Sequence, residues 1–306
     1  MDMYQKREMR KNKKMDENAK SLPSTSINWY PGHMAKTKRE IKEKINLIDI
    51  VYEVIDARMP YSSRIVDLDY IIKDKPRIMI VTKYDLCDKN VTDKFINDYS
   101  KKYRVIKVDL KNNKNSCKEI LALTDELLKD LNKKRMEKGL SKRSYRALVV
   151  GVPNVGKSTL INRFAGRNVV KAANMAGVTK SLSWIRVNKE IELMDSPGIL
   201  WPKIEDEKVG YNLACLTSIK EEILDKEDIA RYIISFLYEN YPDTLFNKYG
   251  ISEIDLNDLT KTYDFIAKKR GALLKGGISD YEKVYTIIIN DLKDGTIKNV
   301  TFDKYE

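Results

Sequence analysis

Continuous apolar runs recur through the first two thirds of the chain and indicate buried strands. Between them, apolar residues return every three or four positions, which is typical of helices. The strands are predicted at 47–56, 77–82, 104–110, 145–150, 182–187 and 190–195, and the helices at 34–46, 91–103 and 115–138. The last two strands flank a predicted hairpin at Asn188-Lys189. Strands that alternate with helices predict an α/β fold, a mostly parallel sheet with helices on both faces.

The strand pattern stops after about Pro202, and amphipathic helices follow, for example at 226–239 and 280–292. A weak strand or turn signal comes after them, around Asp294-Gly295. We therefore predict three parts, which are a basic flexible tail at 1–26, an α/β domain at 27–205 and a small all-helical domain at 206–306.

Charge is unevenly distributed along the chain. The 57 Lys and Arg residues outnumber the 45 Asp and Glu residues, so the net charge is +12 and the pI is near 9.3. Residues 206–306 hold 14 basic and 19 acidic side chains, so the surplus lies in residues 1–205, whose net charge is +17. Such a surplus favours a polyanionic partner, with nucleic acid first and an anionic membrane second.

Composition excludes several classes of protein. Hydrophobic residues make up 42% of the chain and charged residues 33%, which excludes global disorder. The chain has no run of ~18 apolar residues, so no transmembrane helix is predicted. Residues 1–26 lack the apolar core of a secretory signal. Cys87, Cys117 and Cys215 form no CxxC pair, which argues against zinc or a disulfide framework. We expect a cytoplasmic protein with no membrane partner.

A phosphate-binding motif follows the strand at 145–150. The segment Gly151-Val-Pro-Asn-Val-Gly-Lys-Ser-Thr159 fits GxxxxGK[ST] and opens a predicted helix. Its glycines let backbone N–H groups surround phosphates, and the helix N-terminus adds partial positive charge. Lys157 would reach the β- and γ-phosphates, and the Ser158 hydroxyl would ligate Mg²⁺. The nucleotide-binding residues predicted here are Asn154, Val155, Gly156, Lys157, Ser158 and Thr159.

Two further segments suit the γ-phosphate and its metal. Asp195-Ser-Pro-Gly198 ends a predicted strand, where the carboxylate can hold Mg²⁺ through water and the Gly198 N–H can meet the γ-phosphate. Between this segment and the phosphate loop, Thr179 offers a hydroxyl from a loop and is predicted to complete the Mg²⁺ shell.

A base-reading motif comes earlier in the chain. Thr82-Lys83-Tyr84-Asp85 ends the strand at 77–82. Asp85 can accept two hydrogen bonds from guanine, at N1–H and the 2-amino group, and adenine lacks that pair. Lys83 would pack its stem along the base. GTP and GDP are therefore the predicted nucleotides.

The order of these motifs is unusual, because the base-reading motif of ordinary GTPases follows the phosphate loop. Both motifs can still meet one nucleotide, since strand order in space need not follow chain order. Joining the old termini of a domain and cutting it at a loop leaves its site intact. Residues 111–144 would be that joint.

These motifs resemble those of the circularly permuted GTPases, and most closely the ribosome biogenesis GTPase A family (RbgA/YlqF). The segments that carry the resemblance are Ile27 to Lys36 (INWYPGHMAK), Asp56 to Pro60 (DARMP), Thr82 to Asp85, Gly151 to Thr159, Gly177 to Thr179, Asp195 to Ile199, Ile266 to Gly271 and Gly276-Gly277. Three positions depart from the family pattern. Thr82 stands where Asn is usual, Ala176 replaces a Pro, and no Ser-Ala pair backs the guanine near 109–111.

The resemblance implies a circularly permuted P-loop GTPase domain followed by a helical domain that contacts ribosomal RNA. It implies GTP hydrolysis coupled to late maturation of the large ribosomal subunit. The chain would bind the subunit precursor and leave on hydrolysis.

The residue that orients the attacking water is not the usual Gln, because Ile199 follows the DxxG segment and cannot hydrogen-bond water. His33 is the only histidine. A lone His is commonly a loop or capping residue, but the resemblance implies a catalytic role for it. We expect a ribosomal partner to place His33 beside the γ-phosphate, where Lys157, Thr179 and Gly198 complete the catalytic set.

Asn154 is a second candidate for chemistry. Its side-chain oxygen could ligate K⁺ against the phosphates, as the resemblance to potassium-activated GTPases suggests. The alternative is a hydrogen bond within the loop.

Basic residues in the C-terminal part are candidates for binding RNA phosphates. They are Lys268, Lys269, Arg270 and Lys275. The alternative is a solvated helix end. A second basic cluster at 133–143 is interpreted as a solvated helix or linker face.

Three other functions compete with a ribosome assembly factor. A regulatory P-loop GTPase would need another effector module, and none is evident after residue 206. A non-enzymatic RNA scaffold is disfavoured by the intact phosphate and metal motifs. Permuted GTPases of the small subunit carry zinc-binding cysteines, which three scattered cysteines do not match.

Overall fold

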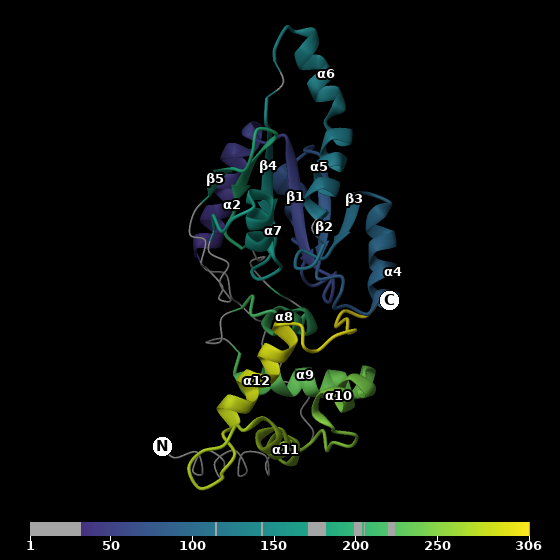
Figure 1. The fold of residues 1–306 in the computed structure, drawn as a ribbon, viewed down its shortest axis with the longest axis vertical. Helices are drawn as coiled ribbons and strands as arrows, with labels where there is room; N and C mark the ends of the chain where they lie inside the picture. Colours follow the sequence, from purple (N-terminus) through teal and green to yellow (C-terminus); the bar gives the residue numbers. More distant parts are fainter. Residues whose placement is uncertain are drawn as a thin grey trace.

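The computed structural model describes residues 32–113, 115–141, 143–170, 182–198, 204, 206–219 and 224–305. A six-stranded sheet lies at the centre of the N-terminal part, in the order β3-β2-β1-β4-β6-β5 (Figure 1). Every neighbouring pair is parallel except β5 and β6. The strands are β1 Ile50–Asp56, β2 Arg77–Thr82, β3 Arg104–Val108, β4 Tyr145–Val150, β5 Ser183–Arg186 and β6 Ile191–Asp195.

Helices cover both faces of this sheet, as the sequence predicts. The apolar residues of β1 alternate, so that Tyr52 and Val54 join a core with α5 and α7, while Val51 joins a core with α2 and α3. A smaller core joins Ile55 to α4 on the second face. The elements are α2 Gly32–Lys44, the 3-10 turn η1 Ile45–Leu47, α3 Leu68–Ile72, α4 Lys89–Ser100, α5 Ser116–Leu127, α6 Lys129–Glu137 and α7 Lys157–Ala165.

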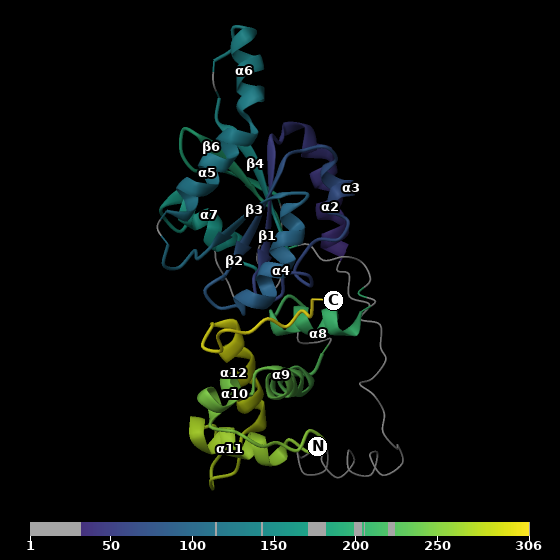
Figure 2. The same cartoon turned by 90° about the vertical axis from the view of Figure 1, so that its right-hand side faces the viewer.

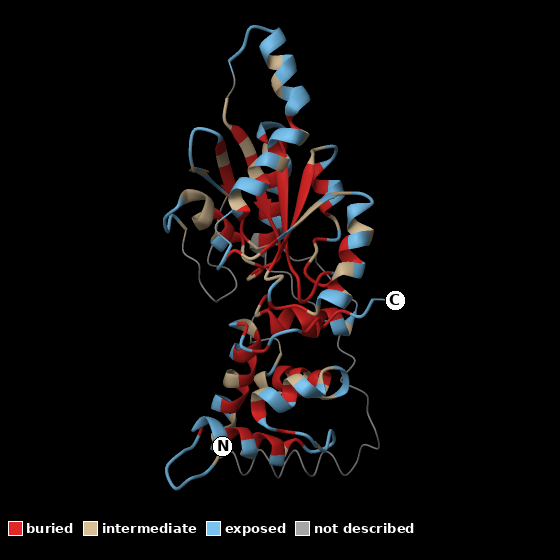
Figure 3. Ribbon diagram, turned by 45° about the vertical axis from the view of Figure 1, so that its right-hand side comes forward, coloured by how far each residue is buried: buried red, intermediate tan, exposed pale blue. Residues whose placement is uncertain are grey.

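The C-terminal part is helical and has its own apolar core, which includes Ile233, Ile266 and Ile288. It lies beyond the ends of the strands, while α6 projects from the opposite end of the molecule (Figure 2). Figure 3 shows the two buried regions separately, the sheet above and the helices below. The helices are α8 Glu207–Cys215, α9 Lys226–Asn240, α10 Pro242–Tyr249, α11 Thr260–Arg270 and α12 Tyr281–Lys293. No helix in the described part of the chain is long and apolar enough to span a bilayer.

The predicted strands and the α/β class are confirmed. One predicted helix needs correction, and one observed helix is absent from the prediction. The helix predicted at 115–138 is divided at Leu128, whose φ of −102° and ψ of 11° leave helical geometry. Leu128 is buried in the core, whereas α6 beyond it buries no side chain. The short helix α3 is absent from the prediction because five residues are too few to show a helical period.

The final residues leave the helical part and return to the loop after β1 and to α4. The Phe302 N–H donates to the Arg58 carbonyl at 2.8 Å, and the Thr301 and Thr92 hydroxyls lie 2.8 Å apart. Figure 1 places the C-terminus beside α4 accordingly. The boundaries 27–205 and 206–306 stay predictions, and the structure adds that contacts cross this division at the end of the chain.

Candidate functional site

The predicted nucleotide motifs meet at one edge of the sheet. The base-reading segment follows β2 and the phosphate loop follows β4, and these parallel strands lie on either side of β1. Chain order reverses between β1 and β4, and ligands of open α/β sheets bind at such a point, beyond the carboxyl ends of the strands. The sheet thus brings together two motifs that lie about seventy residues apart in the sequence.

The phosphate loop has a backbone that only small residues permit. Gly156 has a φ of +105°, a conformation that favours glycine. A Cβ on Gly151 would lie 2.4 Å from the Val54 carbonyl oxygen, and one on Gly198 would lie 2.6 Å from the Pro153 ring. The three glycines therefore keep the loop close to β1 and to the segment after β6, with backbone N–H groups available to an anion.

Lys157 is the first residue of α7 and is buried in the loop. Its Nζ donates to the carbonyls of Gly151, at 3.1 Å, and Val152, at 2.8 Å. Burial lowers the pKa of Lys157 to about 8, and the negative charge of Asp195 opposes that fall. The carbonyls hold the Lys157 ammonium group within the loop, where a phosphate would bind.

Thr82 joins the base-reading segment to the phosphate loop. Its Oγ1 lies 2.6 Å from the Val155 carbonyl and 2.9 Å from the Ile55 carbonyl. A hydroxyl carries one hydrogen, so the two carbonyls share a single donor. Threonine thus still contacts the loop at the position where the family pattern has asparagine.

Lys83 lies between the base-reading turn and the phosphate loop, with a φ of +56°. Its Nζ donates to Asp56 Oδ2 at 2.6 Å and to the Asn154 carbonyl at 3.0 Å. These bonds extend the lysine stem across the ends of β1 and β4. Asp85 is exposed two residues later, so its carboxylate is accessible to a base.

Asp56 and Arg58 form a buried ion pair that sequence reasoning did not assign to the site. Both side chains have no solvent exposure, and Arg58 Nη2 lies 2.9 Å from Asp56 Oδ2. Burial alone would raise the pKa of Asp56, but Arg58 and Lys83 outweigh it and hold that pKa well below its usual range. The DARMP segment indicated a family feature, but no local signal shows what Arg58 contacts.

Oxygen ligands suited to a divalent metal lie at the same edge. Asp195 is buried at the end of β6 and pairs in register with Val149, just before the phosphate loop. Ser158 is half-buried in the first turn of α7. A hydroxyl and a carboxylate are hard donors, and a hard cation that keeps waters and binds phosphates needs few protein ligands. The residues present therefore fit such a metal.

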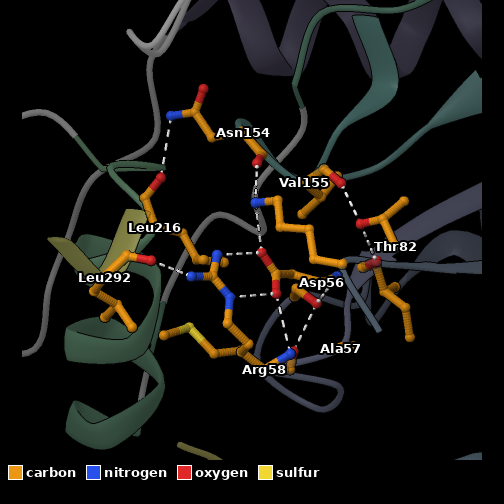
Figure 4. Close-up of polar contacts among 12 residues, drawn as sticks. Asp56, Ala57, Arg58, Thr82, Asn154, Val155, Leu216 and Leu292 are labelled. Atoms are coloured by element: carbon orange, nitrogen blue, oxygen red, sulfur yellow. Dashed lines mark hydrogen bonds and ion pairs between the residues drawn. The ribbon is translucent and has the colours of Figure 1, made fainter. Parts of the chain in front are cut away.

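The Asn154 side chain contacts the turn after α8 in this structure. Its Nδ2 donates to the Leu216 carbonyl at 3.1 Å, and to the Thr217 carbonyl and hydroxyl at 2.8 Å each. Figure 4 shows the side chain extended toward Leu216, in the turn after α8. The side chain thus makes a hydrogen bond, as the alternative interpretation expects. The bond joins two distant parts of the chain and does not lie within the loop.

Two predicted catalytic residues lie wholly or partly outside the described residues. Thr179 is one of them, together with the rest of Gly177 to Thr179. The backbone of His33 lies at the start of α2, and its side chain is outside the described part. Gly198 lies against Pro153 of the phosphate loop, and Thr159 is exposed on α7.

Comparison with known proteins identifies the family. Residues 146–258 match the model of a family described as 50S ribosome-binding GTPase. The ribosome biogenesis GTPase A of Bacillus licheniformis is 45% identical over 280 residues, which cover 92% of this chain and 99% of that protein. The chain belongs to the ribosome biogenesis GTPase A family. The ribosome biogenesis GTPase A of Thermotoga maritima is more distant, with 28% identity across 92% of this chain and 95% of its own length.

A solved structure shares the permuted fold. The crystal structure of GNP-bound YlqF from T. maritima has a TM-score of 0.58 and 27% identity, and the match covers 88% of this chain and 98% of that one. Membership of the ribosome biogenesis GTPase A family makes the chain a GTPase, which binds GTP and GDP.

The candidate RNA-binding residues do not form one equivalent set. Lys268, Lys269 and Lys275 are exposed around the end of α11. Arg270 is exposed as well, but its Nη1 lies 2.5 Å from Asp291 Oδ2, and this pairing raises the pKa of Arg270. The sequence could not reveal the pair because Asp291 belongs to another helix.

Proposed function

We propose that this chain is a GTP-hydrolysing assembly factor that binds the precursor of the large ribosomal subunit. It promotes a late maturation step and leaves when GTP is hydrolysed. The observation that carries the proposal is the convergence of Asp85, Lys157 and Asp195 at one sheet edge. The chain that holds them is 45% identical to a ribosome biogenesis GTPase A, over 99% of that protein's length. The large subunit is favoured because residues 146–258 match a family described as 50S ribosome-binding GTPase. The proposed location is the cytoplasm.

The nucleotide is held in three places. Asp85 accepts the two guanine donors, Lys83 supports the base, and residues 154–159 surround the phosphates with Lys157 at the β- and γ-positions. Ser158, Thr179 and Asp195 are the residues that would hold Mg²⁺, which neutralises charge on the phosphates when bound. The Gly198 N–H donates to the γ-phosphate.

Co-sedimentation with purified ribosomal subunits tests the partner. In the presence of a non-hydrolysable GTP analogue, we expect retention on the large subunit and not on the small one, with release in GDP. Replacing exposed Lys268, Lys269 and Lys275 with Ala should weaken retention and flatten its dependence on salt, because each lysine neutralises one phosphate.

The matched control for these lysines is Lys101→Ala, which removes an exposed lysine paired with Asp98 on α4. If the chain binds neither subunit, with the GTP analogue or with GDP, the proposed ribosomal role is wrong. A GTPase with another regulatory function would then be the better interpretation.

His33 is proposed to act on the attacking water once the ribosome is bound. We expect His33→Ala to reduce ribosome-stimulated turnover by ~10²-fold or more, while leaving GDP affinity unchanged, because general bases contribute about that much. Unchanged stimulated turnover in His33→Ala would remove the catalytic role.

The same assay in K⁺ and in Na⁺ tests the proposed K⁺ ligand Asn154. The side chain now bonds Leu216 and Thr217 through its nitrogen, so its oxygen is the atom that would meet the ion. Equal turnover in the two salts would exclude a potassium site.

A further inference from the structure

The turn that carries Asp85 is held from outside the GTPase domain. The Leu86 N–H donates to the Lys83 carbonyl at 2.9 Å, which closes the turn around Asp85. The Leu86 carbonyl in turn accepts from the Val300 N–H at 3.3 Å. Residues more than two hundred positions later therefore contact the residue next to the guanine-reading carboxylate.

Two neighbouring contacts strengthen this attachment. The Asp88 N–H donates to the Thr301 hydroxyl at 3.1 Å, and Tyr241 of the helical part donates to Asp88 Oδ2 at 3.2 Å. At Gly295, whose φ is +79°, an added Cβ would lie 2.6 Å from the Leu86 side chain. The segment 295–303 thus packs closely along residues 86–88.

Arg58 makes a second, buried connection at the same place. Its guanidinium binds Asp56, which also accepts from Lys83, and its Nη1 donates to the Leu292 carbonyl at the end of α12 (Figure 4). The Arg58 carbonyl accepts from the Phe302 N–H. A chain of hydrogen bonds therefore runs from Lys83 through Asp56 and Arg58 to the helical part.

We propose that Arg58 and the segment 295–303 are positioning elements of the guanine site, which fix the turn that carries Asp85. Guanine binding and docking of this segment then stabilise each other, because a coupling between two sites is reciprocal. This inference rests on guanine recognition by Asp85. It adds a role for residues that do not touch the nucleotide.

The ratio of GDP to IDP affinity measures the positioning, since hypoxanthine lacks the 2-amino group that Asp85 would accept from. We expect Gly295→Ala, which forces Leu86 aside, to lower this ratio by about fivefold or more, the lower range of coupling between sites. Arg58→Met should do the same. A general loss of stability would change both affinities equally and would leave the ratio unchanged.

Matched controls are available for both variants. Gly271→Ala places an alanine at a φ of +64° with no atom within 4 Å of its Cβ, so it adds backbone strain without the Leu86 contact. Arg77→Met removes another buried arginine, which binds Glu53 from the start of β2. Both controls should stay within about twofold of the original ratio. An unchanged ratio in folded Gly295→Ala and Arg58→Met would overturn the proposal, and so would equal changes in the controls.

Hydrogen exchange of the unaltered chain provides a test that does not depend on whether a variant folds. Saturating GDP should slow exchange of the Val300 and Phe302 amides by about fivefold or more. If GDP binds and these amides do not change, positioning by this segment is wrong while guanine binding stands. If GDP does not bind at all, the proposed function fails first.

Discussion

Replacing Asp85 with Asn is expected to weaken GDP binding by a few hundred-fold and to create affinity for XDP. Two charge-assisted hydrogen bonds to guanine would be reduced to one ordinary acceptor and a mismatched donor, a loss of about 3–4 kcal/mol. Xanthine carries a carbonyl where guanine carries its 2-amino group, so the introduced side-chain amide would donate to it. Fluorescence titration with labelled GDP and XDP measures both changes.

Asp93→Asn is the matched control for this exchange. Asp93 lies eight residues later on α4 and accepts from Tyr84 and Lys107, so its substitution removes a nearby carboxylate that has its own partners. We expect GDP affinity within about twofold of the original, as for most surface changes. Unchanged GDP affinity in Asp85→Asn, or a loss without any gain for XDP, would show that Asp85 does not read the base.

Replacing Asp56 with Asn is expected to lower the free energy of unfolding by about 3–5 kcal/mol at pH 7. The substitution leaves Arg58 charged and buried without its counter-ion, and breaking a buried pair carries a penalty of that size. Urea unfolding followed by circular dichroism measures it. Asp98→Asn is the control, because Asp98 and its partner Lys101 are both exposed and their pair should contribute little to the free energy of unfolding.

The same pair predicts how stability depends on pH. The folded pKa of Asp56 is depressed below its ordinary value of 3.8, so its contribution is complete above about pH 4 and is lost as pH falls further. The difference between the original chain and Asp56→Asn should therefore shrink below pH 4, because the carboxylate becomes protonated in the unfolded chain while it stays ionised in the folded one. A difference that stays constant down to pH 3 would contradict this account.

The local geometry of the nucleotide motifs could be predicted because each motif depends on a few consecutive residues. A left-handed glycine at 156, a lysine at the start of a helix and an aspartate after a strand have the same local geometry wherever the motif occurs. The permuted order did not obscure them, because parallel strands bring their carboxyl ends to one edge whatever their order in the chain.

Contacts between distant residues could not be predicted from local pattern. Arg270, a candidate for binding RNA, also pairs with Asp291 on another helix. Asn154, a candidate K⁺ ligand through its side-chain oxygen, also bonds the turn after α8 through its amide nitrogen. In both cases the side chain had a suitable charge or polarity, and the partner was decided by how the helices pack.

The sequence by itself determined the α/β class and the strands, and it predicted residues that could read guanine and bind phosphate, since apolar period and short motifs are local properties. Only the tertiary structure decided that Asp56 and Arg58 join Lys83 to the helical part. It also decided that the last residues return to the turn beside Asp85. The physical reason is that a charged pair is buried only where two parts of the folded chain pack together and exclude water. Those two parts are far apart in the sequence, so no single stretch of the chain reveals the burial or the partners.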